Sequence, residues 1–198
     1  MSIVAAIKKN GRIYMAADTQ SSWGDRKENC LYPERFKVHK FENGLLLGHA
    51  GLVHNSQIVM AQKNIFTLPE KGELNKRYIV ENIIPELRKC YRKNNMLTKE
   101  EGKPDRIEDD YILAYKDKMF TIDNVFDVMA FDHYVAAGSG TDMVVAGLAD
   151  LDSSEVTDSS EIEARLTDIL RIPARYTQSV SGPYCLIDTS SLEYKLVD

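Results

Sequence analysis

The N-terminus of the chain, Met1-Ser2-Ile3-Val4-Ala5-Ala6-Ile7, is an apolar run that starts almost at the first residue. Chain ends usually fray, so a strand at this position has to be tied into a sheet. Side chains alternate between the two faces of a strand, and in this run both faces are apolar. The run therefore predicts a strand over residues 2–8 that is covered on both sides.

Two Asn-Gly pairs, at residues 10–11 and 43–44, each lie between two apolar runs. Asn-Gly in this setting is the strongest short-range signal for a two-residue β-hairpin. The pairs predict an antiparallel sheet whose strands cover residues 2–8, 13–17, 36–41 and 45–50. The polar stretch between the two hairpins, residues 19–34, is expected to be a loop.

Beyond residue 50 the hydrophobic period alternates between that of helices and that of strands. Apolar stripes predict two pairs of helices, at about residues 54–63, 76–94, 141–151 and 160–171. Short apolar runs predict a second antiparallel sheet and a closing hairpin, at residues 111–115, 119–122, 126–130, 134–137, 184–188 and 194–197. The charged stretch 95–110, which includes Glu108-Asp109-Asp110, is interpreted as a solvated loop and not as a metal site.

Two antiparallel sheets with helices segregated into pairs predict an α+β fold. Apolar surface is buried most completely when sheet packs on sheet and a helix pair covers each outer face. We therefore expect a four-layer αββα sandwich, formed by a single domain over residues 1–198. This layering also explains why the first strand is apolar on both faces.

The composition is that of an ordinary globular protein, with 43% apolar residues, 28% charged residues and a net charge of −5. The acidic balance argues against nucleic acid or an anionic membrane as the partner. No apolar stretch approaches the roughly 20 residues of a membrane span, and the N-terminus lacks the pattern of a signal peptide. Three widely spaced cysteines, Cys30, Cys90 and Cys185, favour a reduced, cytoplasmic protein.

Five short motifs follow one another along the chain: Ser2-Ile3-Val4, Ala16-Ala17-Asp18-Thr19-Gln20, Arg35-Phe36-Lys37-Val38, Gly48-His49-Ala50-Gly51-Leu52-Val53 and Tyr134-Val135-Ala136-Ala137-Gly138-Ser139-Gly140. In this order, and over essentially the whole chain, the sequence resembles the proteasome β-type N-terminal nucleophile (Ntn) hydrolases. Among these it is most similar to the bacterial HslV (ClpQ) peptidases. The αββα sandwich of that family is the layering expected above from pattern.

The resemblance implies that Ser2 takes the place of the N-terminal nucleophile, which is usually a threonine. Removal of Met1 would leave Ser2 with a hydroxyl and a free α-amine, a nucleophile that carries its own general base. Lys37 would lie beside Ser2 and lower the pKa of the amine, and Asp18 would pair with Lys37. The backbone N–H of Gly51 would donate to the oxyanion of the tetrahedral intermediate. If Met1 is retained, Ser2 has no free amine and this chemistry fails.

Two serines complete the implied catalytic set. Ser139 matches the serine that helps bind the N-terminal amine and relay its proton. Ser181 fits a serine that many proteasome β subunits carry near the active site, whereas Gln178 stands where those subunits have an aspartate, an acid that HslV-type enzymes also lack. Gly-Ser-Gly at 138–140 could also cradle a phosphate, but the third glycine of G-x-G-x-x-G is absent, which disfavours nucleotide binding.

For the substrate, the resemblance implies an extended peptide that adds between two strand-like edges. Contacts are expected from the Ser22 region and from residues near Gly51. His49 and Val53 would line the pocket for the residue before the cut, and the imidazole would favour acidic or polar side chains there. The histidines and cysteines show no metal-ligand spacing, so neither a metal nor a cofactor is expected.

Three hypotheses describe the whole chain. In the first, it is a self-assembling peptidase whose subunits form a homo-oligomeric ring, fed by an ATP-driven unfoldase of the AAA+ class. In the second, the fold is kept without catalysis and the chain is a structural or regulatory subunit. In the third, it is an amidase of the same chemistry that acts outside a chamber.

Overall fold

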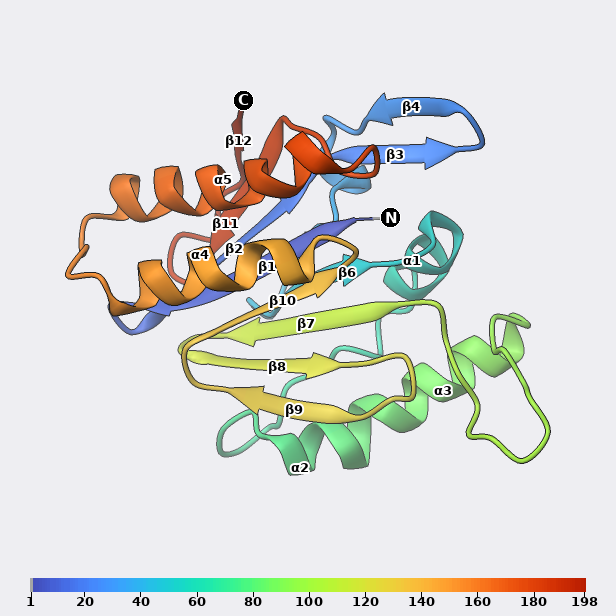
Figure 1. Cartoon of the computed structure of the whole chain (residues 1–198). Helices are drawn as coiled ribbons and strands as arrows, with labels where there is room; N and C mark the ends of the chain where they lie inside the picture. The colour runs from blue at the N-terminus through green and yellow to red at the C-terminus, as the bar shows by residue number, and fades with distance from the viewer. Residues whose placement is uncertain (1) are drawn as a thin grey trace.

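The computed structural model describes residues 2–198 and has four layers, with two β-sheets packed face to face between two layers of helices (Figure 1). The expected αββα sandwich is confirmed, but the expected sheet membership is wrong. The strands near residues 36–41 and 45–50 belong to the second sheet, and the strand near residues 134–137 belongs to the first. An Asn-Gly turn pairs the two strands that it joins and does not decide which sheet the hairpin enters. The expected removal of Met1 concerns a residue outside the described part of the chain.

The first sheet has the strand order β10-β1-β2-β11-β12, and all neighbouring strands are antiparallel. Its members are β1 (Ile3–Lys9), β2 (Arg12–Asp18), β10 (Tyr134–Gly138), β11 (Tyr184–Asp188) and β12 (Lys195–Val197). Helices α4 (Thr141–Ser153) and α5 (Ser159–Tyr176) cover its outer face (Figure 1).

The second sheet has the strand order β5-β6-β7-β8-β9 and is also antiparallel throughout. Its members are β5 (Val38–Lys40), β6 (Leu46–Ala50), β7 (Asp110–Tyr115), β8 (Lys118–Ile122) and β9 (Val128–Phe131). Its outer face is covered by α1 (Val53–Met60) and by a continuous helical segment made of α2 (Lys76–Tyr78), the π-helical turn η2 (Ile79–Ile83) and α3 (Ile84–Lys93). The π-helical turn lies next to Pro85, which has no N–H to donate to the preceding turn.

Strand β1 is buried on both faces, as its sequence predicts. Ile3, Ala5 and Ile7 pack in the cluster formed with α4 and α5, while Val4 and Ala6 pack between the two sheets. Ser2 precedes this strand directly, so its position is fixed by the core of the protein.

The expectation of a loop over residues 19–34 is wrong. This stretch forms a hairpin of β3 (Gln20–Trp23) and β4 (Arg26–Asn29), followed by the 3-10 turn η1 (Pro33–Arg35). The hairpin extends away from the body of the sandwich (Figure 1), and most of its residues are exposed. A ribbon with little buried surface needs no alternation of apolar residues, so the pattern that marks buried strands is missing from its sequence.

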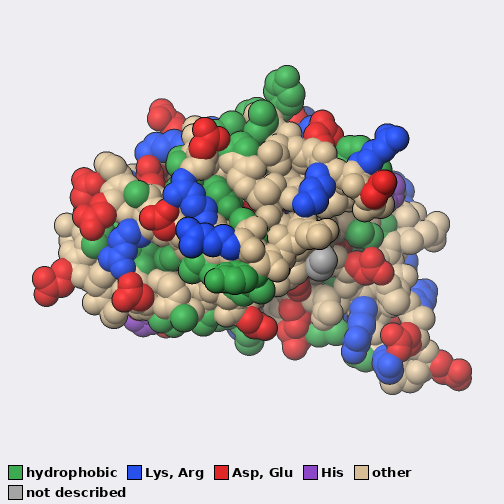
Figure 2. Space-filling model, turned by 45° about the horizontal axis from the view of Figure 1, so that its top comes forward, with side chains coloured by type: hydrophobic (Ala, Val, Ile, Leu, Met, Phe, Trp, Pro, Cys, Tyr) green, Lys and Arg blue, Asp and Glu red, His purple; other side chains and the backbone are tan. Residues whose placement is uncertain are grey.

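The surface and the cysteines complete the description. Lys and Arg side chains are interspersed with Asp and Glu over the face shown in Figure 2. No helix within residues 2–198 has the length and apolar character needed to cross a membrane. Cys30, Cys90 and Cys185 are buried and free.

Candidate active site

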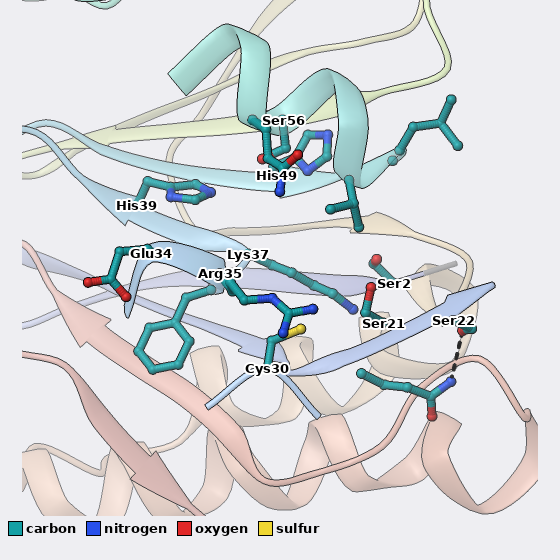
Figure 3. A pocket seen from close by; sticks show the side chains of 16 residues that line it. Ser2, Ser21, Ser22, Cys30, Glu34, Arg35, Lys37, His39, His49 and Ser56 are labelled. Carbon is teal, nitrogen blue, oxygen red and sulfur yellow. Dashed lines mark hydrogen bonds between the residues drawn. The ribbon is translucent and has the colours of Figure 1, made fainter. Parts of the chain in front are cut away.

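A cavity of about 200 Å³ lies next to the start of β1, between the β3 strand, the segment that leads into β5, and the beginning of α1 (Figure 3). The lining includes six of the residues predicted from sequence: Ser2, Ser22, Lys37, His49, Gly51 and Val53. Residues from separate motifs therefore meet at one place. Asp18 and Ser139 contact members of this group from behind, as described next.

Asp18 and Lys37 form a buried ion pair beside Ser2. The Lys37 Nζ donates to both carboxylate oxygens of Asp18, at 2.8 Å each, and in Figure 3 the ammonium points toward Ser2 and Ser21. The same carboxylate accepts the backbone N–H of Ile3 at 2.9 Å and that of Gln20 at 3.1 Å. Burial raises the pKa of Asp18 and lowers the pKa of the Lys37 ammonium, and the charge of each partner opposes the shift of the other.

The end of β10 holds the backbone of Ser2. The Ser139 N–H donates to the Ser2 carbonyl at 2.9 Å. Gly138 has a φ of +102°, and a Cβ at this position would lie 2.1 Å from the Ser2 carbonyl oxygen, so only glycine fits. Because the Ser139 N–H is already used, the Gly-Ser-Gly turn lacks one of the donors that a phosphate cradle would need.

Ser179 and Ser181 lie two positions apart in the sequence but have different neighbours in the structure. The Ser139 hydroxyl lies 3.5 Å from the Ser179 hydroxyl, which donates to Thr177 Oγ1 at 3.3 Å. Ser181 donates to Asn29 Oδ1 at 3.2 Å and does not line the cavity. The sequence similarity places residues 176–182 near the site, but it does not decide whether Ser179 or Ser181 faces Ser139.

Asp109 is a buried residue that the sequence analysis missed, and the interpretation of residues 95–110 as a solvated loop is wrong at this end. Asp109 is 2% exposed, and so is Ile107. Its carboxylate accepts hydrogen bonds from His49 Nε2 at 2.7 Å, the Leu52 N–H at 3.0 Å, Asn55 Nδ2 at 2.7 Å and the Tyr91 hydroxyl at 2.5 Å. A carboxylate within a run of charged residues carries no sequence signal of burial, because its donors come from β6, α1 and α3.

Gly51 lies between this carboxylate and the cavity. A Cβ at position 51 would lie 2.0 Å from Asp109 Oδ1 and 2.7 Å from the Glu108 carbonyl oxygen, so a side chain is excluded. The next residue, Leu52, gives its N–H to Asp109. The Gly51 N–H forms no hydrogen bond to any other residue in the range 2–198. An unpaired backbone donor beside a serine is suited to binding a developing oxyanion.

The Asp109 network predicts a pH-dependent contribution to stability. Burial alone would raise the pKa of Asp109, but the hydrogen bonds from His49, Tyr91 and Asn55 outweigh burial and hold it below its usual range. A depressed folded-state pKa stabilises the fold above the unfolded pKa, and this contribution is lost as the pH falls below about 4. Urea unfolding across this range should show that Asp109→Asn destabilises the protein most near neutral pH and progressively less in acid. A stability difference that stays constant with pH would contradict the assignment.

The cations of the cavity lining are paired. Lys37 is bound to Asp18, and Arg35 forms a bidentate pair with Glu28 at 3.1 Å. The ring of His49 is hydrogen-bonded to Asp109. His39 differs, because its buried Nε2 has no hydrogen-bond partner among the described residues. Burial and the neighbouring His49 lower the pKa of His39 to about 4, so its imidazole is neutral at neutral pH. No group of three or more His, Cys, Asp or Glu side chains within residues 2–198 is arranged to hold a metal ion.

Comparison with known proteins gives the fold class. No protein-family model matches the sequence, and no curated protein matches it significantly. Among solved structures, the chain is similar to BPH of Thiobacillus denitrificans, with a TM-score of 0.76 and 19% identity over 96% of this chain and 98% of that one. It is also similar to Anbu (ancestral beta-subunit) of Yersinia bercovieri, with a TM-score of 0.70 and 15% identity over 98% of this chain and 86% of that one.

A third similar structure is eukaryotic HslV from Trypanosoma brucei, with a TM-score of 0.63 and 17% identity over 94% of this chain and 98% of that one. The chain therefore has the proteasome β-like fold of the Ntn hydrolases. At these identities the similarity defines the fold and does not assign the chain to BPH, Anbu or HslV in particular.

Proposed function

We propose that this protein is an N-terminal serine peptidase that hydrolyses peptide bonds with Ser2 as its nucleophile. One observation carries the proposal: a single buried carboxylate, that of Asp18, binds both the Lys37 ammonium and the backbone N–H of Ile3. Ile3 follows Ser2 directly in the chain, so Asp18 fixes the position of the Lys37 ammonium relative to that of Ser2. The cavity that both residues line offers a place for the scissile bond.

The proposed mechanism uses groups of this chain and one water molecule. After removal of Met1, the α-amine of Ser2 accepts the proton of the Ser2 hydroxyl as the Oγ attacks the substrate carbonyl. The Lys37 ammonium lowers the pKa of the amine and stabilises the negative charge on Oγ. The Gly51 N–H donates to the oxyanion of the tetrahedral intermediate. The protonated α-amine gives its proton to the leaving amine as the peptide C–N bond breaks, and the water then hydrolyses the ester formed on Ser2. The Ser139 hydroxyl, which lies 3.4 Å from the Ser2 carbonyl oxygen, helps to relay the proton of the amine.

Intact-mass measurement of untagged protein, before and after incubation with epoxomicin, tests this proposal. One of the BPH structures is a complex with epoxomicin, which makes the compound a suitable probe. We expect a mass without Met1, and a further gain of one epoxomicin per chain that is absent from Ser2→Ala. A chain that keeps Met1 and gains no mass would support the second hypothesis, a structural or regulatory subunit without catalysis.

The peptidase is further proposed to be a cytoplasmic homo-oligomer. One of the similar structures is the helical assembly of the Anbu complex from Pseudomonas aeruginosa, at a TM-score of 0.68 and 14% identity. A ring of subunits, with an AAA+ unfoldase as partner, is the form proposed here. Light scattering of the purified protein separates the alternatives, because a monomer with peptidase activity would favour an amidase that acts outside a chamber.

The cavity predicts a preference for uncharged polar side chains before the cleaved bond. The lysine and the arginine of its lining are already paired with carboxylates. The His39 imidazole, which has no hydrogen-bond partner within residues 2–198, is neutral. A Gln side chain can form a hydrogen bond with His39 Nε2, whereas a Leu side chain cannot. The complex with Leu therefore loses the free energy of that hydrogen bond. Fluorogenic peptides with Gln at this position should therefore have a kcat/KM at least about tenfold above those with Glu or Leu, and His39→Leu should reverse the order of Gln and Leu. A faster reaction with Glu would contradict this reading.

A further inference from the structure

The Asp109 carboxylate lies directly behind the wall of the cavity. It does not line the cavity, but His49, Gly51 and Leu52 do. One oxygen atom, Asp109 Oδ1, contacts His49 and Leu52 through hydrogen bonds of 2.7 and 3.0 Å. The same atom occupies the space into which a side chain at position 51 would project. The conformations of three wall residues, His49, Gly51 and Leu52, therefore depend on a single atom.

The other oxygen of the carboxylate is anchored in the helical layer. Asp109 Oδ2 accepts from Asn55 Nδ2 of α1 at 2.7 Å and from the Tyr91 hydroxyl of α3 at 2.5 Å. The Tyr91 hydroxyl also lies 2.6 Å from that of Tyr111, on β7. An ionised carboxylate with this many donors is a rigid element, since hydrogen bonds to a charged group are about twice as strong as neutral ones.

We propose that Asp109 is a positioning residue for the reacting centre, which holds the Gly51 N–H toward the cavity and fixes the His49 ring in its wall. An ionised carboxylate only accepts hydrogen bonds, so the proton of the bonded His49 nitrogen sits on Nε2. Asp109 itself touches neither the substrate nor Ser2. The inference rests on the proposed function for its effect on rate, because a fixed Gly51 N–H matters to catalysis only if an oxyanion forms beside it.

The test compares Asp109→Asn with the matched control Tyr91→Phe. Asparagine keeps the shape of the side chain but has one acceptor oxygen in place of two, so it cannot accept both the hydrogen bonds of the wall and those of the helices. Tyr91→Phe removes one donor to Oδ2 and leaves the contacts of Oδ1 in place. Both changes cost stability, so any difference in rate between the two folded variants reports on positioning.

For peptide cleavage we expect Asp109→Asn to lower kcat by about 10- to 100-fold, which is less than the roughly 100- to 1,000-fold cost of a missing oxyanion donor because the Gly51 N–H is displaced and not removed. KM should change less than about threefold, since the loss falls on the transition state. Tyr91→Phe should keep kcat within about threefold of the wild type. Rates are measured at a temperature where circular dichroism shows both variants folded. A kcat for Asp109→Asn equal to that of Tyr91→Phe would overturn the inference.

A second readout does not require activity. Hydrogen–deuterium exchange followed by mass spectrometry should show faster exchange of the peptide that covers residues 48–53 in Asp109→Asn, and no such change in Tyr91→Phe. Unchanged exchange in Asp109→Asn would overturn the inference even if activity fell. If Ser2→Ala cleaves peptides as well as the wild type does, the proposed function fails, whereas faster exchange in Asp109→Asn would still support the positioning of this wall by Asp109.

Discussion

Replacing Ser2 by alanine should lower peptide cleavage by at least about 1,000-fold, because the substitution removes the attacking oxygen. Alanine is as suited as serine to the position after Met1, and it is smaller than the buried side chain it replaces. The fold and the processing of the N-terminus should therefore be unaffected. Steady-state cleavage of a fluorogenic peptide measures the effect.

Ser2→Thr is the matched control for this experiment. It keeps the hydroxyl and adds one methyl group, which restricts the side chain to fewer rotamers. We expect cleavage by Ser2→Thr to be comparable to that of the wild type and inhibited by epoxomicin. If Ser2→Ala and the wild type cleave equally, Ser2 is not the nucleophile, and the activity belongs to another residue or to a contaminant.

Replacing Lys37 by methionine should reduce both activity and stability, for two separate reasons. Catalysis loses the positive charge beside Ser2. The fold is left with the fully buried Asp18 carboxylate without its counter-ion, and breaking a buried ion pair in this way costs about 3–5 kcal/mol. Urea unfolding and peptide cleavage are measured on the same preparation.

The double variant Asp18→Asn/Lys37→Met separates the two effects. Asparagine is neutral, and its single oxygen can still accept one of the two N–H groups, those of Ile3 and Gln20, that the two oxygens of Asp18 bind at 2.9 and 3.1 Å. We expect the double variant to recover part of the lost stability, because no buried charge is left unpaired, while peptide cleavage remains as low as in Lys37→Met. Recovery of cleavage together with stability would show that the ion pair serves the fold alone.

Buried strands could be predicted from the sequence, whereas an exposed hairpin could not. The burial of β1 on both faces follows from Ile3, Val4 and Ala5 in succession, because alternation along a strand is a local rule. The layered architecture follows from the order of strand and helix patterns. The β3–β4 hairpin could not be predicted in this way, since a polar and largely exposed ribbon carries no apolar period.

The residues around the cavity were likewise predicted only in part. Sequence alone suggested Ser2, Lys37 and Gly51, because each belongs to a motif with a known order along the chain. It did not suggest Asp109 or Ser179, whose partners lie on other elements: Asp109 binds His49 across the two adjacent strands β6 and β7, and Ser179 lies beside Ser139 at the end of β10.

The amino-acid sequence by itself determined the strands of the two main sheets, the helices and the αββα layering, because these depend on periodicity and on turn residues that act over a few positions. It did not determine which strands share a sheet. Only the tertiary structure decided that Asp109 is buried behind Gly51, that Ser179 faces Ser139, and that Arg35 in the cavity lining is paired with Glu28. Burial and pairing of a charged side chain depend on which groups surround it in space, and those groups come from parts of the chain that no local pattern connects.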